Sequence, residues 1–137
     1  MPTNYQRGRG AEYLAIKMLT EVGFLCTRAA QSKGLFDVVA VRHDVVLFIQ
    51  AKLSKQDKGF SEDDNCRSAR EVRVPACAKK QLWYFVSGKG LTEIRDLAEP
   101  PIDARTKEGR KRKAEAREWA ATFKEAVSHA RRRKKDG

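Results

Sequence analysis

Asp37, Gln50 and Lys52 are polar residues inside two otherwise apolar segments, residues 35–41 and 45–53. A tight turn between the segments would join them as a hairpin, in which Asp37 lies near Gln50. Side chains alternate across a strand, so Gln50 and Lys52 share one face. An acid, an amide and an amine therefore converge at the half-buried end of a hairpin, where polar groups need partners. A metal ion with bound water would supply such partners.

Glu12 is a further acidic candidate, on a predicted helix. An apolar stripe at helical spacing predicts this helix over residues 11–22, and Gly23 suits its end. The stripe consists of Ala11, Leu14, Ala15, Met18, Leu19 and Val22. Glu12 lies on its flank, about a quarter turn from the centre. A carboxylate there can reach the edge of a sheet.

The remaining pattern predicts the elements that must position these residues. We expect strands over residues 24–28, 35–41, 45–53, 80–87 and 91–97, one helical turn within the polar loop 54–70, an extended segment at 72–74 and a long helix from Thr106. This order favours an α/β fold with a mixed central β-sheet, flanking helices and a basic C-terminal helix. Pro100-Pro101 suggests a division into domains 1–99 and 100–137. Trp83, Tyr84 and Phe85 favour core packing or a dimer interface over a base-stacking platform.

The charge of the chain points to a polyanionic partner. The 137 residues include 29 Lys and Arg and 18 Asp and Glu, a net charge of +11. Residues 105–137 hold 13 basic and 5 acidic residues, a net of +8. Nucleic acid is the usual partner for such an excess. The three cysteines form no CxxC pair, which favours free thiols in a reducing cytoplasm over a zinc site. No apolar run is long enough for a membrane helix, and we expect no secretory signal and a cytoplasmic protein.

Glu12, Asp37 and the run Gln50-Ala51-Lys52 resemble, in order and spacing, the core of the PD-(D/E)xK nucleases. More narrowly, the segment from Arg7-Gly8-Arg9-Gly10-Ala11-Glu12 to Lys52 resembles the archaeal-type Holliday junction resolvases, including phage-encoded relatives, which would act in the host cytoplasm. The resemblance implies a restriction-endonuclease-like fold and a homodimer that resolves four-way DNA junctions by paired symmetric nicks. It also implies Mg²⁺, with Mn²⁺ as a substitute, and no small-molecule cofactor.

The resemblance assigns roles to individual residues. The implied metal ligands are Glu12, Asp37, Gln50 and the Ala51 carbonyl, and the implied catalytic residues are Glu12, Asp37, Gln50, Lys52 and Ser32. Lys52 would orient water or stabilise charge on the phosphorane, with Ser32 near the scissile phosphate. The expected DNA contacts are Arg7, Arg9, Arg28, Lys33, Lys55, Arg110, Lys111, Arg112, Lys113, Arg131, Arg132 and Arg133. Basic side chains in unbroken runs are suited to phosphate contacts.

Two residues depart from the family pattern. Phe36 replaces the usual Pro, and Gln50 stands where the family usually has Glu. An amide oxygen can bind a metal but has no charge, so we expect a need for millimolar metal and expect Gln50→Glu to keep or raise activity. Two alternatives stay open: another PD-(D/E)xK enzyme, such as a nickase or flap nuclease, and a catalytically weak nucleic-acid-binding module.

Overall fold

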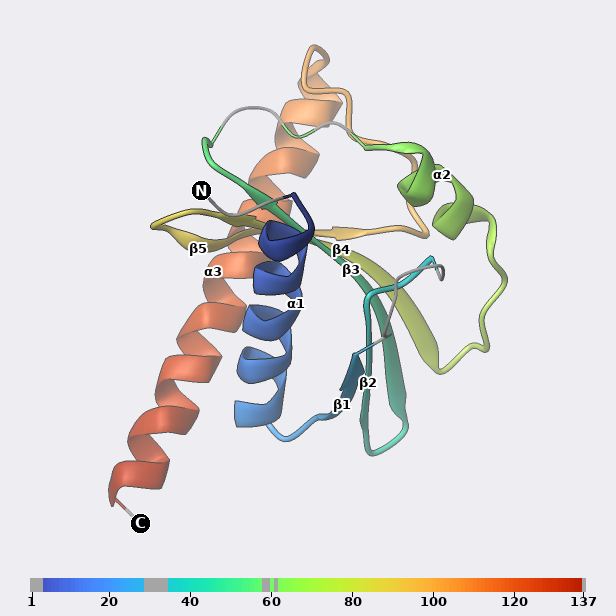
Figure 1. The fold of residues 1–137 in the computed structure, drawn as a ribbon. Helices are drawn as coiled ribbons and strands as arrows, with labels where there is room; N and C mark the ends of the chain where they lie inside the picture. The colour runs from blue at the N-terminus through green and yellow to red at the C-terminus, as the bar shows by residue number, and fades with distance from the viewer. Residues whose placement is uncertain (1–3, 29–34, 58–59, 61, 137) are drawn as a thin grey trace.

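The computed structural model describes residues 4–28, 35–57, 60 and 62–136, with side chains from residue 10 to residue 135 within these ranges. The described residues form three helices and five strands, whose arrangement can be followed in Figure 1. In order they are α1 (Asn4–Glu21), β1 (Leu25–Arg28), β2 (Val38–Arg42), β3 (Val45–Ser54), α2 (Asp64–Glu71), β4 (Ala78–Val86), β5 (Gly90–Asp96) and α3 (Lys107–Asp136).

The strands form one mixed sheet in the order β1-β2-β3-β4-β5. All neighbouring strands are antiparallel except β3 and β4, which are parallel. A parallel pair needs a crossover connection, and α2 lies within the segment that links β3 to β4. The α/β fold with a mixed sheet, flanking helices and a C-terminal helix is therefore confirmed.

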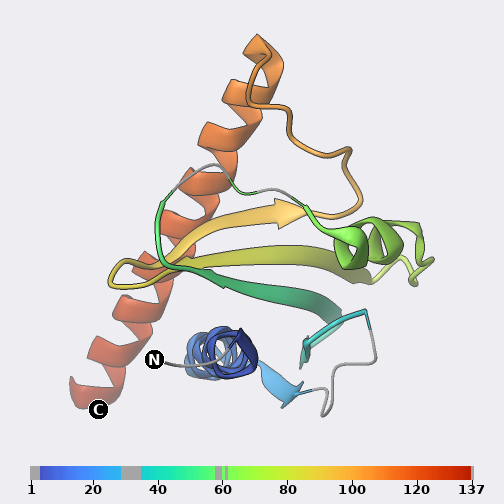
Figure 2. The ribbon, with the colours of Figure 1, turned by 45° about the horizontal axis from the view of Figure 1, so that its top comes forward.

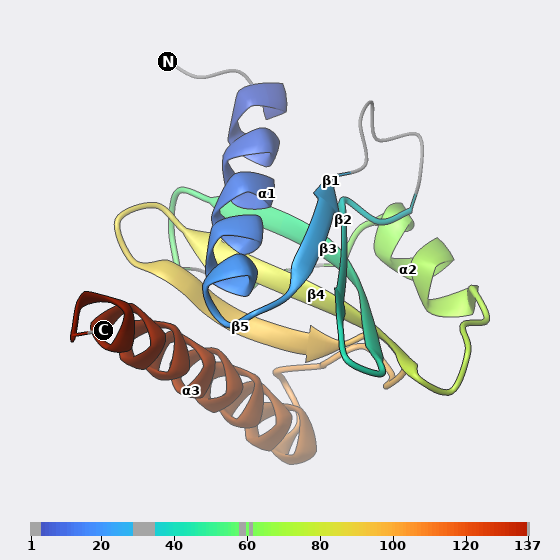
Figure 3. The same ribbon diagram turned by 90° about the horizontal axis from the view of Figure 1, so that it is seen from below.

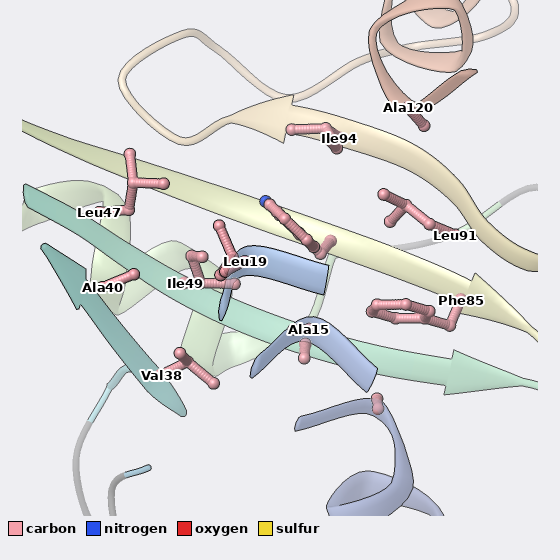
Figure 4. Packing of buried hydrophobic residues seen from close by; sticks show 13 residues of the cluster. Ala15, Leu19, Val38, Ala40, Leu47, Ile49, Phe85, Leu91, Ile94 and Ala120 are labelled. Atoms are coloured by element: carbon pink, nitrogen blue, oxygen red, sulfur yellow. The ribbon is translucent and has the colours of Figure 1, made fainter. Parts of the chain in front are cut away.

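One face of the sheet packs against α1 and α3 (Figure 3). Small residues of α1, Ala11 and Ala15, allow the helix to approach the sheet closely, and Leu19 follows on the same face. Figure 4 shows this cluster between α1, the sheet and α3. Trp83 and Phe85 of β4 belong to it and are each only 1% exposed. Both are therefore core residues, with no surface left for contact with a second copy.

The other face of the sheet packs against α2, and Figure 2 shows α1 and α2 on opposite sides of the β3–β4 pair. Cys66 and Ala69 of α2 contact a cluster that includes Leu82 and Tyr84 of β4. Phe60 stacks on Tyr84 with ring centroids 3.9 Å apart and planes at 10°. Since side chains alternate along β4, its aromatic run is divided between two cores, which confirms the prediction of core packing.

Helix α1 is rotated relative to the predicted stripe. Leu14, placed near the centre of the stripe, is 43% exposed, whereas Ala11, Ala15 and Leu19 are completely buried. The buried face is set by the small residues that fit closest to the sheet rather than by the mean direction of the apolar residues. This rotation carries Glu12 further inward than predicted.

Helix α2 is longer than the single turn that we predicted. Asp63 is its N-cap, and its side chain accepts a hydrogen bond from the backbone N–H of Cys66. Val72 has the extended backbone that we expected, although residues 72–74 belong to no strand. Strand β4 begins at Ala78, two residues before the predicted start. The polar sequence of α2 is stabilised by its cap and by two buried small residues rather than by a broad apolar stripe.

Helix α3 contributes to the same core as the sheet. Its buried hydrophobic residues are Ala116, Ala120 and Val127, and Phe123 meets Trp83 edge to face at 5.1 Å between centroids. The C-terminal turns of α3 then continue past the sheet (Figure 1). The domain boundary at residue 99 stays a prediction. No helix in the described ranges is long and apolar enough to cross a membrane.

Candidate active site

The β2–β3 hairpin fixes the register of the candidate site. Arg42 pairs with Val45, so a two-residue turn joins the strands. His43 adopts a φ of 53° in this turn, as the first position of a tight hairpin turn requires. Val38 pairs with Ile49 at the other end of the hairpin. Asp37 directly precedes this last pair of the ladder, and Gln50 directly follows it, so the two residues lie near each other, as the sequence predicted.

Asp37 lies at the end of the hairpin, and one of its two carboxylate oxygens accepts a hydrogen bond. Its backbone N–H donates to the Ile49 carbonyl at 2.8 Å, and its Oδ2 accepts from the Ala51 N–H at 2.9 Å. Burial raises the pKa of the Asp37 carboxyl, and the negative charge of Asp63 adds to this rise. The hydrogen bond from the Ala51 N–H and the positive charge of Lys52 act in the opposite direction but do not cancel it. Among the described residues, no donor reaches Oδ1 and no ion pair forms at this carboxylate. A cation would find a favourable place here.

Gln50 is buried, and both ends of its amide have partners. Nε2 donates to the Leu35 carbonyl at 2.6 Å, and Oε1 accepts from the Cys66 thiol at 3.0 Å. A carbonyl can only accept, so Leu35 fixes the orientation of the amide. Burial raises the pKa of Cys66 to about 11, which keeps the thiol protonated as a donor. Gln50 thus ties β3 to the segment before Asp37 and to α2. The predicted metal-ligand role would require Oε1 to release Cys66, and it stays a prediction.

Lys52 points to the same face of β3 as Gln50 and pairs with Asp63, a residue that the sequence analysis missed. Lys52 Nζ lies 2.5 Å from Asp63 Oδ2, while Asp63 Oδ1 accepts the Cys66 N–H at 3.0 Å. Partial burial raises the pKa of Asp63, but the hydrogen bonds from Lys52 and Cys66 outweigh it and hold the pKa below its usual value. The available signal was an acid directly before a short helix, which is an N-cap pattern.

Glu12 approaches the same end of the sheet from the opposite face. Its carboxylate lies 3.6 Å from Arg28 Nη1. Arg28 pairs across the strands with Val38, the residue after Asp37. Arg28, predicted as a DNA contact, also lies over the Tyr13 ring at 5.3 Å from the centroid. The structure thus brings Asp37, Ala51 and Lys52 together, whereas Glu12 pairs with Arg28, on the strand next to the start of β2.

The donor set for a metal ion is small. No group of three His, Cys, Asp or Glu suited to metal binding occurs among the residues that the structure describes. The N–H and C=O of one strand residue point to the same side of the strand, so the Ala51 carbonyl faces the Asp37 side. These two oxygens fit a hard cation such as Mg²⁺, which keeps several waters and binds proteins through one or two carboxylates.

The basic residues of α3 are partly engaged within the protein. Arg110 donates to the Arg105 carbonyl at 3.0 Å, and Arg112 donates to the Pro100 carbonyl at 2.6 Å. Both side chains therefore hold the segment before α3. Exposed basic residues of α3 with no partner among the described residues include Lys111, Arg132, Arg133, Lys134 and Lys135.

Two predicted DNA contacts differ in their setting. Arg131 forms an ion pair with Glu21 at the end of α1, so it ties α3 to α1. Lys55 is exposed just after β3. Ser32 and Lys33, and the side chains of Arg7 and Arg9, lie outside the described part of the chain.

Gln50→Glu is expected to destabilise the protein in the absence of metal. The substitution replaces the Nε2 donor with an oxygen beside the Leu35 carbonyl, and it buries a charge. We expect unfolding in urea with EDTA to require about 1–3 kcal/mol less than for wild type. Because a cation that binds only the folded state stabilises it, millimolar Mg²⁺ should recover part of this loss, and cleavage should be kept or raised.

Gln56→Glu makes the same chemical change at an exposed position after β3 and serves as the matched control. Equal stability of Gln50→Glu and wild type in EDTA would contradict the contacts assigned to Gln50. Abolished cleavage in a folded Gln50→Glu protein would contradict the expectation for its activity.

Comparison with known protein families agrees with the motif and its geometry. Residues 3–70 match the family model described as archaeal Holliday junction resolvase (Hjc). The matched region runs through α1, β1, β2, β3 and nearly all of α2. A comparison with curated proteins gave no match. Through residues 3–70, and with the fold in agreement, the chain belongs to the archaeal Holliday junction resolvase family.

Proposed function

We propose that this protein is a metal-dependent endonuclease that resolves four-way DNA junctions by paired symmetric nicks. The observation that carries the proposal is the Asp37 carboxylate, half-buried beside Ala51 and Lys52 with one oxygen that no described donor reaches. The family match over residues 3–70 supports the substrate class.

Asp37 Oδ1 and the Ala51 carbonyl are the proposed protein ligands of Mg²⁺ or Mn²⁺, and Glu12 is the second carboxylate near this end of the sheet. When bound, the metal supplies an activated water and neutralises charge on the phosphate. Asp37 remains fixed during the reaction because the Ala51 N–H holds its Oδ2. The half-buried setting strengthens the attraction between this carboxylate and a cation.

Lys52 is the proposed catalytic cation. A fixed ammonium beside the metal carboxylate can orient the attacking water and stabilise negative charge as it builds on the phosphate oxygens. The Lys52 side chain is 34% exposed, so it can reach a bound phosphate as well as Asp63. Ser32 stays a proposed neighbour of the scissile phosphate.

Affinity for DNA is assigned mainly to the basic end of α3. Arg132, Arg133, Lys134 and Lys135 are exposed residues of the last turns of α3, and these turns continue past the sheet (Figure 1). A helix of 30 residues is about 45 Å long. In this proposal, the phosphate contacts along the junction arms are made by residues outside the site of cleavage.

A homodimer would place two such sites on a two-fold substrate. Since Trp83 and Phe85 are buried under α1 and α3, a dimer must use another surface. Exposed apolar candidates are Leu25 and Val41, which pair directly across β1 and β2. Light scattering on the purified protein measures the oligomeric state directly.

A panel of labelled substrates tests the proposed function. Wild-type protein is incubated with a four-way junction, a flap and a linear duplex of shared sequence, each with Mg²⁺, Mn²⁺ or EDTA. We expect paired nicks at opposing positions of the junction in either metal, and none in EDTA. Preferred cleavage of the flap favours another nuclease of the superfamily. Tight junction binding without cleavage in either metal favours a binding module, an alternative that the neutral Gln50 supports.

A further inference from the structure

Helix α2 is held against the candidate site by two side chains of β3 that share one face. Gln50 accepts a hydrogen bond from the Cys66 thiol at 3.0 Å, and Lys52 binds the Asp63 carboxylate at 2.5 Å. Cys66 is completely buried, so its position is fixed by packing as well as by hydrogen bonding. The first turn of α2 is therefore attached to the two polar residues of the nuclease motif on β3.

Asp63 occupies a fixed position because it caps α2. Its Oδ1 accepts the Cys66 N–H at 3.0 Å, which leaves Oδ2 directed to Lys52 Nζ. Lysine has a flexible four-carbon stem, and its ammonium is a point charge without a preferred orientation. The Asp63 carboxylate is held in place by the helix cap, so its contact with the Lys52 ammonium restricts where that ammonium lies.

The Lys52–Asp63 pair contributes little to the stability of the fold. The two side chains are 34% and 47% exposed, and ion pairs at such exposure add little to folding free energy. Asp63 is close enough to Asp37 for its charge to raise the pKa of that carboxyl. The repulsion between the two carboxylates disfavours the charged form of Asp37. The presence of Asp63 at this position is therefore better explained by its contact with Lys52.

We propose that Asp63 is a positioning residue that holds the Lys52 ammonium in the geometry needed for phosphodiester cleavage. The inference rests on the proposed catalytic role of Lys52. It extends the active site to α2, a helix that contributes none of the motif residues. In this arrangement Gln50 secures α2, the α2 cap fixes Asp63, and Asp63 orients Lys52.

Asp63→Asn tests the proposal, because Asn caps a helix as well as Asp but has no charge. The substitution is expected to lower the single-turnover rate of junction cleavage about 10- to 30-fold, since small displacements of a catalytic group have effects of this order. Junction affinity and thermal stability should match wild type. Asp64→Asn, the same change one residue later on an exposed side chain that pairs with Arg67, should leave the rate unchanged.

A double-mutant cycle separates positioning from independent effects. In a Lys52→Met background, Asp63→Asn should lower the rate by no more than about twofold, because its effect acts through the ammonium. Multiplied losses in the double variant overturn the proposal. A cleavage rate of the Asp63→Asn variant equal to or above that of wild type also overturns it. A lower rate that is accompanied by a matching fall in the Tm overturns it as well. A wild-type protein that cleaves no junction refutes the proposed function itself, whereas these outcomes, in a protein that cleaves, refute the role of Asp63 alone.

Discussion

Lys52→Met is expected to lower the single-turnover rate of junction cleavage by about 10²- to 10³-fold, which corresponds to about 3–4 kcal/mol of transition-state stabilisation. Methionine keeps an unbranched side chain of similar length and removes the ammonium with its charge and N–H donors. The partner left behind, Asp63, has a side chain that is 47% exposed and can be solvated by water. The loss should therefore appear in the rate and not in the Tm. Quenched-flow or manual time courses at saturating protein and metal measure it.

Lys79→Met is the matched control for this prediction. Lys79 is an exposed residue near the start of β4, paired in register with Leu47 rather than with a residue of the motif. We expect its variant to cleave at the wild-type rate. Wild-type cleavage by Lys52→Met would remove Lys52 from the chemistry and leave Asp37 as the only supported catalytic residue on the hairpin.

Replacing Arg132, Arg133, Lys134 and Lys135 with glutamine is expected to weaken junction binding at least about 30-fold near physiological salt. Each phosphate contact with duplex DNA contributes about 0.9 to the slope of log K against log salt. The loss of two to four contacts should therefore flatten the slope by about 2–4. Titrations of labelled junction at several salt concentrations give both quantities. The cleavage rate at saturating protein should change little, because none of these residues contacts the described residues of the candidate site.

Two double variants test whether the loss of binding depends on the place of the basic residues at the end of α3 or on charge alone. Arg132→Gln with Arg133→Gln is compared with Arg73→Gln and Lys79→Gln, which change two exposed basic residues outside α3. Equal weakening by the two pairs would mean that the overall charge of +11, and not the end of α3, determines affinity. Substitution leaves Phe123 and the other core contacts of α3 in place, which truncation of the helix would remove.

The geometry around Asp37 could be predicted because it depends on local rules. Alternation along a strand and a short turn place Asp37 near Gln50 and put Lys52 on the face of Gln50. Both features follow from residues within one hairpin. The sequence therefore indicated an acid, an amide and an amine at one end of the sheet, and the structure has them there.

The partners of these groups could not be predicted because they come from distant segments. Cys66 and Asp63 reach Gln50 and Lys52 only because α2 packs on the sheet face formed by Leu82 and its neighbours. No periodicity within the polar loop indicates that contact. The sequence showed an amide where the family has a carboxylate, whereas the structure shows what that amide contacts.

Charge counting had a similar limit. The basic runs on α3 correctly identified a charged helix, but their members differ in accessibility. Arg112 holds the chain before α3, and Arg131 pairs with Glu21, which is 110 residues away in sequence. Only tertiary packing separates these structural arginines from the basic residues at the C-terminal end that have no partner among the described residues. The net charge of the chain therefore indicated a nucleic-acid partner without showing which residues bind it.

Cleavage of a labelled four-way junction by wild type and by Asp37→Asn, side by side in Mn²⁺ at saturating protein, tests the central claim most directly. Asn keeps an oxygen for the Ala51 N–H, and it removes a carboxylate whose charge is disfavoured by burial, so the variant should fold and bind as wild type does. We expect paired nicks from wild type and a rate at least about 10³-fold lower from Asp37→Asn. Equal cleavage by both proteins, or no cleavage by wild type in Mg²⁺ or Mn²⁺ despite full binding, would contradict a metal-dependent active site at Asp37.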